Sequence, residues 1–259
     1  MAGDLSESTL RSALGDRPFR FEEVTGSTNS DALDWAAEGA PQGAVVVAEQ
    51  QTAGRGRWGR AWSSEPGRAL MFSIVLRPQI GLDRVGLITT ALGVGCVAGI
   101  ERATGLRARL KWPNDVTRSG RKLAGILVES RVTAEGIEAA VGGVGLNVAY
   151  REEDFPEEIA GRATSIAMES GAAASRPDIL SAILDSFSTV YPVSDERVLL
   201  ERATELSDVL ERTVRVRFAD GRSLEGRALR LVAGGALEIE TAGGIITIES
   251  GEVETLRSE

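Results

Sequence analysis

The sequence predicts an α+β fold in which one mostly antiparallel sheet has helices to one side and is followed by a small β-barrel. Two patterns support this prediction. Apolar runs of strand length alternate with longer stretches of helical spacing, and short, evenly spaced strands take over after residue 210. A chain of 259 residues is long enough for one large domain or two modest ones.

The first 104 residues are expected to alternate helices and strands. A short helix is predicted at 5–14 and an edge-like strand at 19–24, and the polar residues 26–31 are typical of a helix N-terminus. The apolar runs at 44–49 and 69–76 have the length of strands. A long helix packed on those strands is predicted over 82–104 from apolar residues at helical spacing, namely Val85, Ile88, Leu92, Cys96 and Ile100.

The second half is expected to complete the sheet and then change character. Strands are predicted at 106–112, 122–132 and 137–148, with a turn at 119–120 and a polar loop at 150–163. Amphipathic helices follow, marked by apolar residues in 179–187 and 198–210. From residue 211, alternation between an Asp-Gly turn and two Gly-Gly pairs predicts an SH3-like barrel. We therefore expect a larger domain at 1–210 and a small one at 211–259.

Two scarce residue types narrow the chemistry. Histidine is absent, which excludes His-dependent nucleophiles, His general bases and His-ligated metals. Cys96 is the single cysteine and lies in an apolar segment, so disulfide frameworks and cysteine-ligated zinc are excluded as well. What remains must depend on carboxylates, lysine, arginine, hydroxyls and backbone amides.

The net charge and the apolar segments indicate which partners and which cellular location to expect. A net charge of -9 and a pI near 4.9 argue against broad binding to nucleic acid or anionic membranes. In the most membrane-like segment, Arg84, Glu101 and Arg102 bracket an apolar run shorter than the ~20 residues of a span. The first ten residues lack a basic start and an apolar signal core. A cytoplasmic protein is expected.

Lysine is confined to one short stretch of the chain. Of the 29 basic residues, two are lysines, Lys111 and Lys122, and the other 27 are arginines. Two clustered ammonium groups in an arginine-rich chain indicate sites where a compact point charge matters. Codon bias combined with accident explains the same count equally well.

The segment after the 44–49 strand carries three glycines and three arginines in the seven positions 54–60. It satisfies G-x-G-x-x-G, the dinucleotide-binding fingerprint, but residues 61–67 cannot open a helix and no acidic residue follows about 20 positions on. A flexible backbone carrying forked cations is instead suited to closing over an anion. The alternative is a solvated basic turn.

Three later segments combine strand ends with polar residues or glycine. KWPNDV (111–116) places an ammonium, an amide and a carboxylate at a strand end, although a simple Asn-Asp turn has the same pattern. RKLAGILVE (121–129) puts Lys122 at a strand start, with Gly125 letting a group lie against the sheet. GGVGLNV (142–148) is a third strand thinned by glycine. A strained or edge strand would also explain the glycines of 142–148. A surface lysine beside a bulge would also explain the pattern of 121–129.

Taken together and in order, these segments resemble the biotin protein ligase family, from about residue 20 to the end. The matching features are Ser27-Thr28-Asn29, Gln51 with GRGRWGRAW, KWPNDV, RKLAGILVE, GVGLNV and the closing small barrel. The resemblance implies a mixed sheet related to class II aminoacyl-tRNA synthetases. It also implies two reactions: biotin and ATP form biotinyl-5'-AMP with Mg²⁺, and a lysine of a biotin carboxyl carrier domain then takes the biotinyl group.

The resemblance also implies roles for individual residues. Lys122 and Arg57 would be catalytic, and Asp115 would lie near Mg²⁺. Biotin contacts would come from Ser27, Thr28, Asn29, Gln51, Gly54, Arg55, Arg57, Trp62, Lys122, Gly125 and Gly143. Contacts to ATP and the adenylate would come from Arg55, Arg57, Arg60, Lys111, Asn114, Lys122 and Asn147. Gly125 and Gly143 would leave room for the bicyclic ring, and Trp62 would pack beneath the arginine-rich loop.

Several alternatives stay open beside this resemblance. Lipoate or octanoate transfer belongs to the same fold, although a Cys-dependent transferase is disfavoured because Cys96 lies mid-helix. Twenty-six residues precede Ser27, too few for a DNA-binding winged helix of about sixty, so repressor activity and DNA binding are not expected. No tryptophan occurs in 150–163, where some members place an adenine-stacking aromatic. A monomer or weak homodimer is expected.

Overall fold

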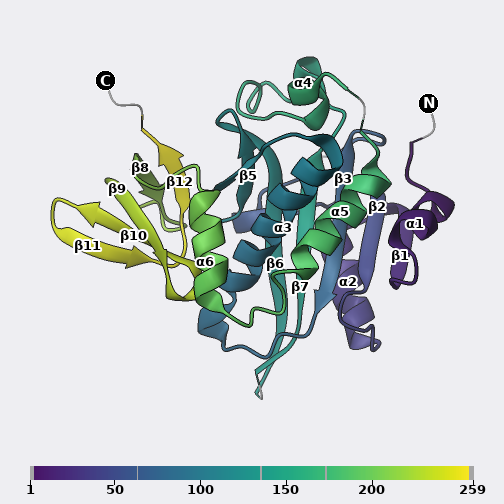
Figure 1. The fold of residues 1–259 in the computed structure, drawn as a ribbon, viewed down its shortest axis with the longest axis horizontal. Coiled ribbons are helices and arrows are strands. Elements are labelled where there is room, and N and C mark those ends of the chain that lie inside the picture. Colours follow the sequence, from purple (N-terminus) through teal and green to yellow (C-terminus); the bar gives the residue numbers. More distant parts are fainter. Residues whose placement is uncertain (1–2, 63, 135, 173, 257–259) are drawn as a thin grey trace.

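The computed structural model describes residues 3–62, 64–134, 136–172 and 174–256. Within these ranges the chain forms a seven-stranded sheet and a separate five-stranded sheet, which includes the last strand, β12 (Glu252–Thr255). The five-stranded sheet lies at the left of Figure 1, and α1 (Glu7–Leu14) lies at the far right. The remaining helices are α2 (Thr28–Ala37), α3 (Gly86–Thr104), α4 (Ile166–Ser170), α5 (Arg176–Ser188) and α6 (Glu196–Glu205).

The larger sheet has the order β1-β2-β3-β7-β6-β5-β4. Its parallel pair is β1 with β2, and the other five ladders are antiparallel, which confirms the predicted mostly antiparallel sheet. Edge strand β1 is largely exposed, as expected, whereas every residue of β3 is buried. The strands are β1 (Phe19–Thr25), β2 (Val45–Gln51), β3 (Ala69–Leu76), β4 (Arg109–Lys111), β5 (Asp115–Arg118), β6 (Arg121–Thr133) and β7 (Gly136–Asn147).

The expectation that helices lie to one side of the sheet was wrong. Ala32 of α2 belongs to a buried cluster with Val75 and Val141, whereas Ile74 belongs to the core formed with α3 and α5. Consecutive residues of a strand point to opposite faces, so Ile74 and Val75 meet helices on opposite faces of β3. Both faces are therefore covered: α3 and α5 lie side by side across one (Figure 1) and α2 packs on the other.

Helix α3 is the central core helix, and a one-turn 3-10 helix at Leu82–Arg84 precedes it. By length and composition Leu82–Thr104 is the one helix of the described chain that could cross a membrane, so the expectation that this run is too short was wrong on those criteria. In the folded chain Leu92 and Cys96 are fully buried. The backbone of α5 also packs closely on α3, because a Cβ built on Gly99 would lie 2.4 Å from Ile183 Cα.

Two segments differ from the sequence prediction because they form edge contacts. Residues 113–118, to which the sequence assigned no element, contain β5, which folds back so that Asp115 pairs with Lys111. Helix α6 ends at Glu205 rather than near 210, because the chain then runs along β4: Leu110 N donates to Leu206 O (2.8 Å) and Asp208 N to Leu110 O (2.7 Å). This pairing covers the edge of the sheet. The short helix α4 was not predicted.

The five-stranded sheet forms the C-terminal part, with the antiparallel order β11-β10-β9-β8-β12. It has its own apolar core, which includes Val214, Val216 and Leu237, as the alternating pattern predicts. Trp112 packs into that core and donates from Nε1 to Gly235 O (2.9 Å), so the KWPNDV segment connects the two sheets. The remaining strands are β8 (Thr213–Arg217), β9 (Ser223–Val232), β10 (Ala236–Thr241) and β11 (Gly244–Ile248).

Candidate active site

The α2-covered face of β7 organises the predicted site residues. Gly143, Gly145 and Asn147 are two positions apart, so they point to the same face and form a row about 13 Å long. A Cβ built on Gly143 would lie 2.1 Å from Asn29 Oδ1, and one built on Gly145 would lie 2.4 Å from Trp62 Cε2. The glycines therefore let other side chains lie directly on the sheet.

A buried polar cluster lies at the start of α2. Gln51 Oε1 accepts from Thr28 N (2.8 Å) and Thr28 Oγ1 (3.0 Å), and Thr28 Oγ1 accepts from Ser73 Oγ (2.8 Å). Ser27 is the buried N-cap residue of α2, and its side chain makes no cap hydrogen bond. Sequence analysis missed Ser73. The available signal was that it is the one polar residue in the apolar run 69–76.

Asn29 links this cluster to β6. Its Oδ1 accepts from Ser73 Oγ (2.6 Å), and its Nδ2 donates to Glu129 Oε2 (2.7 Å) and Leu127 O (3.2 Å). Because Asn29 lies directly over Gly143, the space expected for a ligand above that glycine is filled by protein here. Glu129 was another missed residue, and it also receives Arg55 Nη2 at 3.2 Å.

Trp62 lies flat over the paired glycines Gly125 and Gly145. A Cβ on Gly125 would meet both Trp62 Cζ3 (3.0 Å) and Lys122 Nζ (3.2 Å), and the ammonium lies 5.6 Å from the indole centroid. The Trp62 indole N–H is buried, and the described residues offer it no acceptor. A buried donor without a partner is costly, so this position favours a ligand that carries an acceptor.

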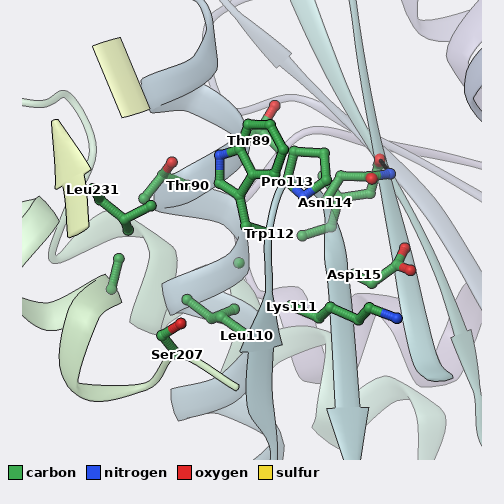
Figure 2. A pocket seen from close by; sticks show the side chains of 13 residues that line it. Thr89, Thr90, Leu110, Lys111, Trp112, Pro113, Asn114, Asp115, Ser207 and Leu231 are labelled. Carbon is green, nitrogen blue, oxygen red and sulfur yellow. Dashed lines mark hydrogen bonds between the residues drawn. The ribbon is translucent and has the colours of Figure 1, made fainter. Parts of the chain in front are cut away.

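Lys122 is the cation at the centre of the site. Its Nζ lies 2.7 Å from Asp115 Oδ1, and its backbone is fixed by Arg162 O, which accepts from Lys122 N at 2.8 Å. The Lys122 side chain is about 38% exposed, so solvent reaches it. Figure 2 shows Lys111 and Asp115 projecting to the same side, away from Leu110. Because Lys122 of β6 pairs with Asp115, its ammonium lies on the side of the β4–β5 hairpin to which Asp115 projects.

Both predicted asparagines use their amide groups to hold neighbouring backbone. Asn114 Nδ2 donates to Ile126 O (2.8 Å), and Asn147 Nδ2 donates to Thr164 O (3.0 Å). Phe155 lies in the segment that lacks a tryptophan. Its ring stacks on Tyr150 (centroids 5.0 Å apart), and Trp62 packs against the same small apolar cluster. Burial raises the pKa of the Tyr150 hydroxyl, which accepts from Glu65 N (3.0 Å).

We define the arginine loop as residues 54–62, and its two ends are held together. Arg55 bridges to Ala61, and Trp62 N donates to Gly54 O (2.9 Å). A Cβ on Gly54 would lie 2.6 Å from Trp62 O and 2.9 Å from Gln51 Nε2, so the glycine is needed for this close approach. In the described residues that follow the loop the next element is strand β3 and not a helix, as the sequence predicted, which removes the dinucleotide-binding interpretation.

At its tip the arginine loop reaches the C-terminal sheet. Arg57 Nη1 donates to Gly251 O (2.8 Å) and lies 3.4 Å from Asn114 Oδ1, while Arg60 Nη2 donates to Glu252 Oε2 (2.7 Å). Burial lowers the pKa of Arg57, and the nearby charges of Glu252 and Asp115 oppose this effect. The loop expected to close over an anion therefore packs against protein partners in this structure.

Two observations concern ligands: the size of a neighbouring pocket between α3 and residues 111–115, and the acidic side chains available for a metal. The pocket in Figure 2, lined by Thr90, Leu110, Trp112 and Leu231 among others, has a volume of about 30 Å³. That is room for about one water and none for biotin or adenine. Among the described residues no three acidic or cysteine side chains gather into a metal-binding group. One carboxylate, Asp115, fits a Mg²⁺ ion that receives its other ligands from phosphates and water.

Known proteins match the part of the chain that contains the site residues described above. Residues 21–147 match the biotin/lipoate A/B protein ligase family. A biotin–[acetyl-CoA-carboxylase] ligase of Mycobacterium tuberculosis is 34% identical over 98% of this chain and 96% of its own length. The bifunctional ligase/repressor BirA of Bacillus subtilis is 34% identical over 97% of this chain and 79% of its own length.

Solved structures agree with these relatives. The biotin protein ligase of Aquifex aeolicus, in complex with biotin and ATP, superposes with a TM-score of 0.79 at 29% identity, over 93% of this chain and 99% of that one. The Leishmania major ligase in complex with biotinyl-5-AMP shares the fold, with a TM-score of 0.64 at 24% identity and coverage of 93% and 99%. This chain therefore belongs to the biotin/lipoate A/B protein ligase family, and the proteins similar to it over nearly its whole length include a biotin–[acetyl-CoA-carboxylase] ligase and a biotin protein ligase of solved structure.

Proposed function

We propose that this protein activates biotin with ATP and transfers it to a lysine of a biotin carboxyl carrier domain. In the first step an oxygen of the biotin carboxylate attacks the α-phosphorus of ATP, the bond to the β-phosphate breaks, and pyrophosphate leaves. In the second step the lysine amine attacks the acyl carbon, loses a proton, and AMP leaves. The carrier domain is the proposed protein partner, and a monomer or weak homodimer is the proposed form.

The observation that carries this proposal is the position of Lys122 beside Trp62 on a glycine-thinned sheet. The ammonium lies 5.6 Å from the centre of the Trp62 indole ring, and the buried indole N–H has no acceptor among the described residues, so a ligand bound here would meet both a cation and an unsatisfied donor. A fixed cation stabilises the negative charge that builds up on the oxygens of phosphorus during attack. We propose Lys122 as the group that holds the biotin carboxylate against the α-phosphate.

The buried polar cluster supplies directional groups for the biotin ring. Asn29 and Trp62 cover neighbouring glycines of the β7 row, and Ser27, Thr28 and Gln51 belong to the same polar cluster as Asn29. The urea-like ureido group of biotin offers one carbonyl acceptor and two N–H donors to such a cluster. A polar cluster inside an otherwise apolar wall is the usual design of a small-molecule site. We extend the cluster to Ser73, which orients both Thr28 and Asn29 through its hydroxyl.

The nucleotide is proposed to lie toward Asn147 and the β4–β5 hairpin. Asn114, Asn147 and Lys111 are the proposed ATP contacts, and Phe155 is the proposed aromatic neighbour of adenine in this chain. Mg²⁺ would be held by Asp115 together with the phosphates, where it neutralises their charge. Arg55, Arg57 and Arg60 would cover the adenylate, which excludes water that could hydrolyse the acyl phosphate.

The proposed setting is the cytoplasm. Cys96 is buried and unpaired, and an unpaired cysteine is typical of a reducing compartment. ATP as a substrate agrees with this location. We do not propose DNA as a partner, because a net charge of -9 opposes broad contact with phosphates. A gel shift with promoter DNA tests that choice, and a retarded band would overturn it.

The decisive experiment is incubation of the protein with ATP, Mg²⁺, biotin and a purified carrier domain. We expect one biotinyl addition to a single carrier lysine by mass spectrometry, and biotin-dependent exchange of pyrophosphate into ATP. Lys122→Ala should lower the exchange rate by about 10²–10³ or more. Arg131→Ala, at the exposed far end of β6, is the matched control and should retain activity. Exchange driven by lipoate and not by biotin would favour the lipoate branch of the family.

Arg57→Ala separates the two proposed steps. Without the guanidinium we expect the adenylate still to form but to leave the site before transfer, because the loop no longer closes. The measurement is free biotinyl-5'-AMP in the filtrate, beside carrier biotinylation. Intact transfer with no rise in free adenylate would remove Arg57 from this role.

A further inference from the structure

We propose that the β11–β12 turn, and Glu252 above all, is a latch that holds the arginine loop closed and so limits the escape of biotinyl-5'-AMP. This inference rests on the proposed function for its substrate and on the observed contacts for its geometry. It makes Glu252 a positioning residue, since it acts through Arg60 and touches no reacting atom.

The contacts of the loop tip come from three consecutive residues of the C-terminal sheet. Ser250 Oγ accepts from Arg57 Nη2 (3.0 Å), Gly251 O accepts from Arg57 Nη1 (2.8 Å), and Glu252 pairs with Arg60. The two arginines therefore share one short docking surface. Because the latch residues lie in a different sheet from the proposed substrate contacts, closing the loop also joins the two sheets across the site.

The latch turn is built tightly against the C-terminal core. A Cβ on Gly251 would lie 2.6 Å from Val216 Cγ1 and 3.3 Å from Arg217 O, so this position has no room for a side chain. Residue 251 is itself buried. A carbonyl fixed in this way offers Arg57 a rigid acceptor, whereas a mobile turn would lose entropy on docking.

The charge arrangement explains why Glu252 matters more than its neighbours. Arg57 is half-buried, and the nearby carboxylates of Glu252 and Asp115 partly offset the cost of burying its charge. Arg60 is about 60% exposed and Glu252 about 31%, so their pair is partly screened by water. Exposed pairs of this kind shift an equilibrium by about two- to fivefold. The latch is thus weak enough to open for substrate entry and carrier access.

The first test compares Glu252→Gln with Glu254→Gln. Glu254 lies two residues further along the same strand and carries the same charge. It pairs with Arg217 (Nη2 to Oε2, 2.9 Å) and not with an arginine of the loop, which makes it a matched control. We expect Glu252→Gln to raise the release rate of biotinyl-5'-AMP by about two- to fivefold, and Glu254→Gln to leave it unchanged. Ser250→Ala should raise the release rate in the same direction.

A charge swap tests whether Glu252 acts through Arg60. Arg60→Glu alone should increase release, and adding Glu252→Arg should restore part of the loss, because the opposite charges then pair in reverse. Release rates of Glu252→Gln and Glu254→Gln that both equal the wild-type rate would overturn the latch, and so would a swap that restores nothing.

Limited trypsin digestion of the ligand-free protein gives a readout without activity. Cleavage after Arg57 and Arg60 requires the loop to open, so Glu252→Gln should be cut there about two- to fivefold faster than Glu254→Gln. If the wild type forms no biotinyl-5'-AMP yet shows this difference, the proposed substrate fails and the latch stands. Equal cleavage rates would refute the latch whatever the substrate.

Discussion

Removal of the buried guanidinium of Arg176 is expected to destabilise the fold strongly. The side chain is 2% exposed and donates to Glu49 Oε1 and Oε2 (3.0 and 2.9 Å), to Asp4 Oδ1 (2.5 Å) and to Ala69 O (2.9 Å). Glu49 also accepts from Gly67 N. One side chain thus joins the N-terminal segment, the start of α5, β2 and the start of β3.

The magnitude follows from what Arg176→Ala leaves behind. Glu49 is 15% exposed, so its carboxylate would lose its charge partner in a largely buried position, whereas Asp4 is 43% exposed and can be solvated. Breaking a buried pair by removing one partner costs about 3–5 kcal/mol. For a chain of this size that corresponds to a fall in Tm of about 6–20 °C.

The assay is thermal unfolding followed by circular dichroism, with Arg197→Ala as the control. Arg197 is an exposed arginine that also pairs with carboxylates, Asp195 and Glu201, so its loss should leave Tm unchanged within error. Arg176→Lys should recover part of the loss, since charge returns without the two-pronged geometry. If Arg176→Ala lowers Tm no more than Arg197→Ala does, the reasoning from burial is wrong.

Three further predictions follow from close packing and burial. Gly145→Ala should displace Trp62 and weaken biotin binding, measured by calorimetry, about tenfold or more, while Tm is largely kept. An unchanged affinity would contradict the placement of biotin beside Trp62. Gly99→Ala should lower the free energy of unfolding by about 1–3 kcal/mol in urea, although alanine favours helices, because Ile183 backbone blocks the new methyl; a gain would show that α3 and α5 separate freely. Burial raises the pKa of Cys96 to about 12. The folded state therefore keeps a neutral thiol where an unfolded chain ionises near 9, so stability falls as pH rises from about 9 toward 12, and native thiol labelling at pH 8 should be far slower than in urea.

Much of the fold was accessible from local pattern. Strand-length runs such as 69–76 and the helical spacing of 82–104 identified central elements, because periodicity follows from which face of an element is buried. The β5 strand and the end of α6 were missed, since each is decided by pairing with β4 rather than by its own sequence. The position of α2 on the opposite face of the sheet was also missed, because it depends on which strands the helix packs against and not on the helix sequence alone.

The residues of the candidate site also fall into two groups, those that the sequence identified and those that only the structure revealed. Lysine scarcity drew attention to Lys122 because the residue type is rare in this chain, whereas Trp62 and Asn147 were identified through the family resemblance of the segments that contain them. Ser73, Glu129 and Gly145 were missed. Their importance comes from what lies over them in space, and a single sequence contains no record of those neighbours.

The sequence by itself determined the element types, the two-sheet layout and the residues able to carry charge without histidine. Only the tertiary structure decided which of those residues meet: Arg57 and Gly251 are 194 positions apart, yet a guanidinium of one sheet docks on a carbonyl of the other. Periodicity is a local property, readable along the chain. Contact across that separation depends on strand order and sheet packing, which arise from the burial of all the apolar faces at once.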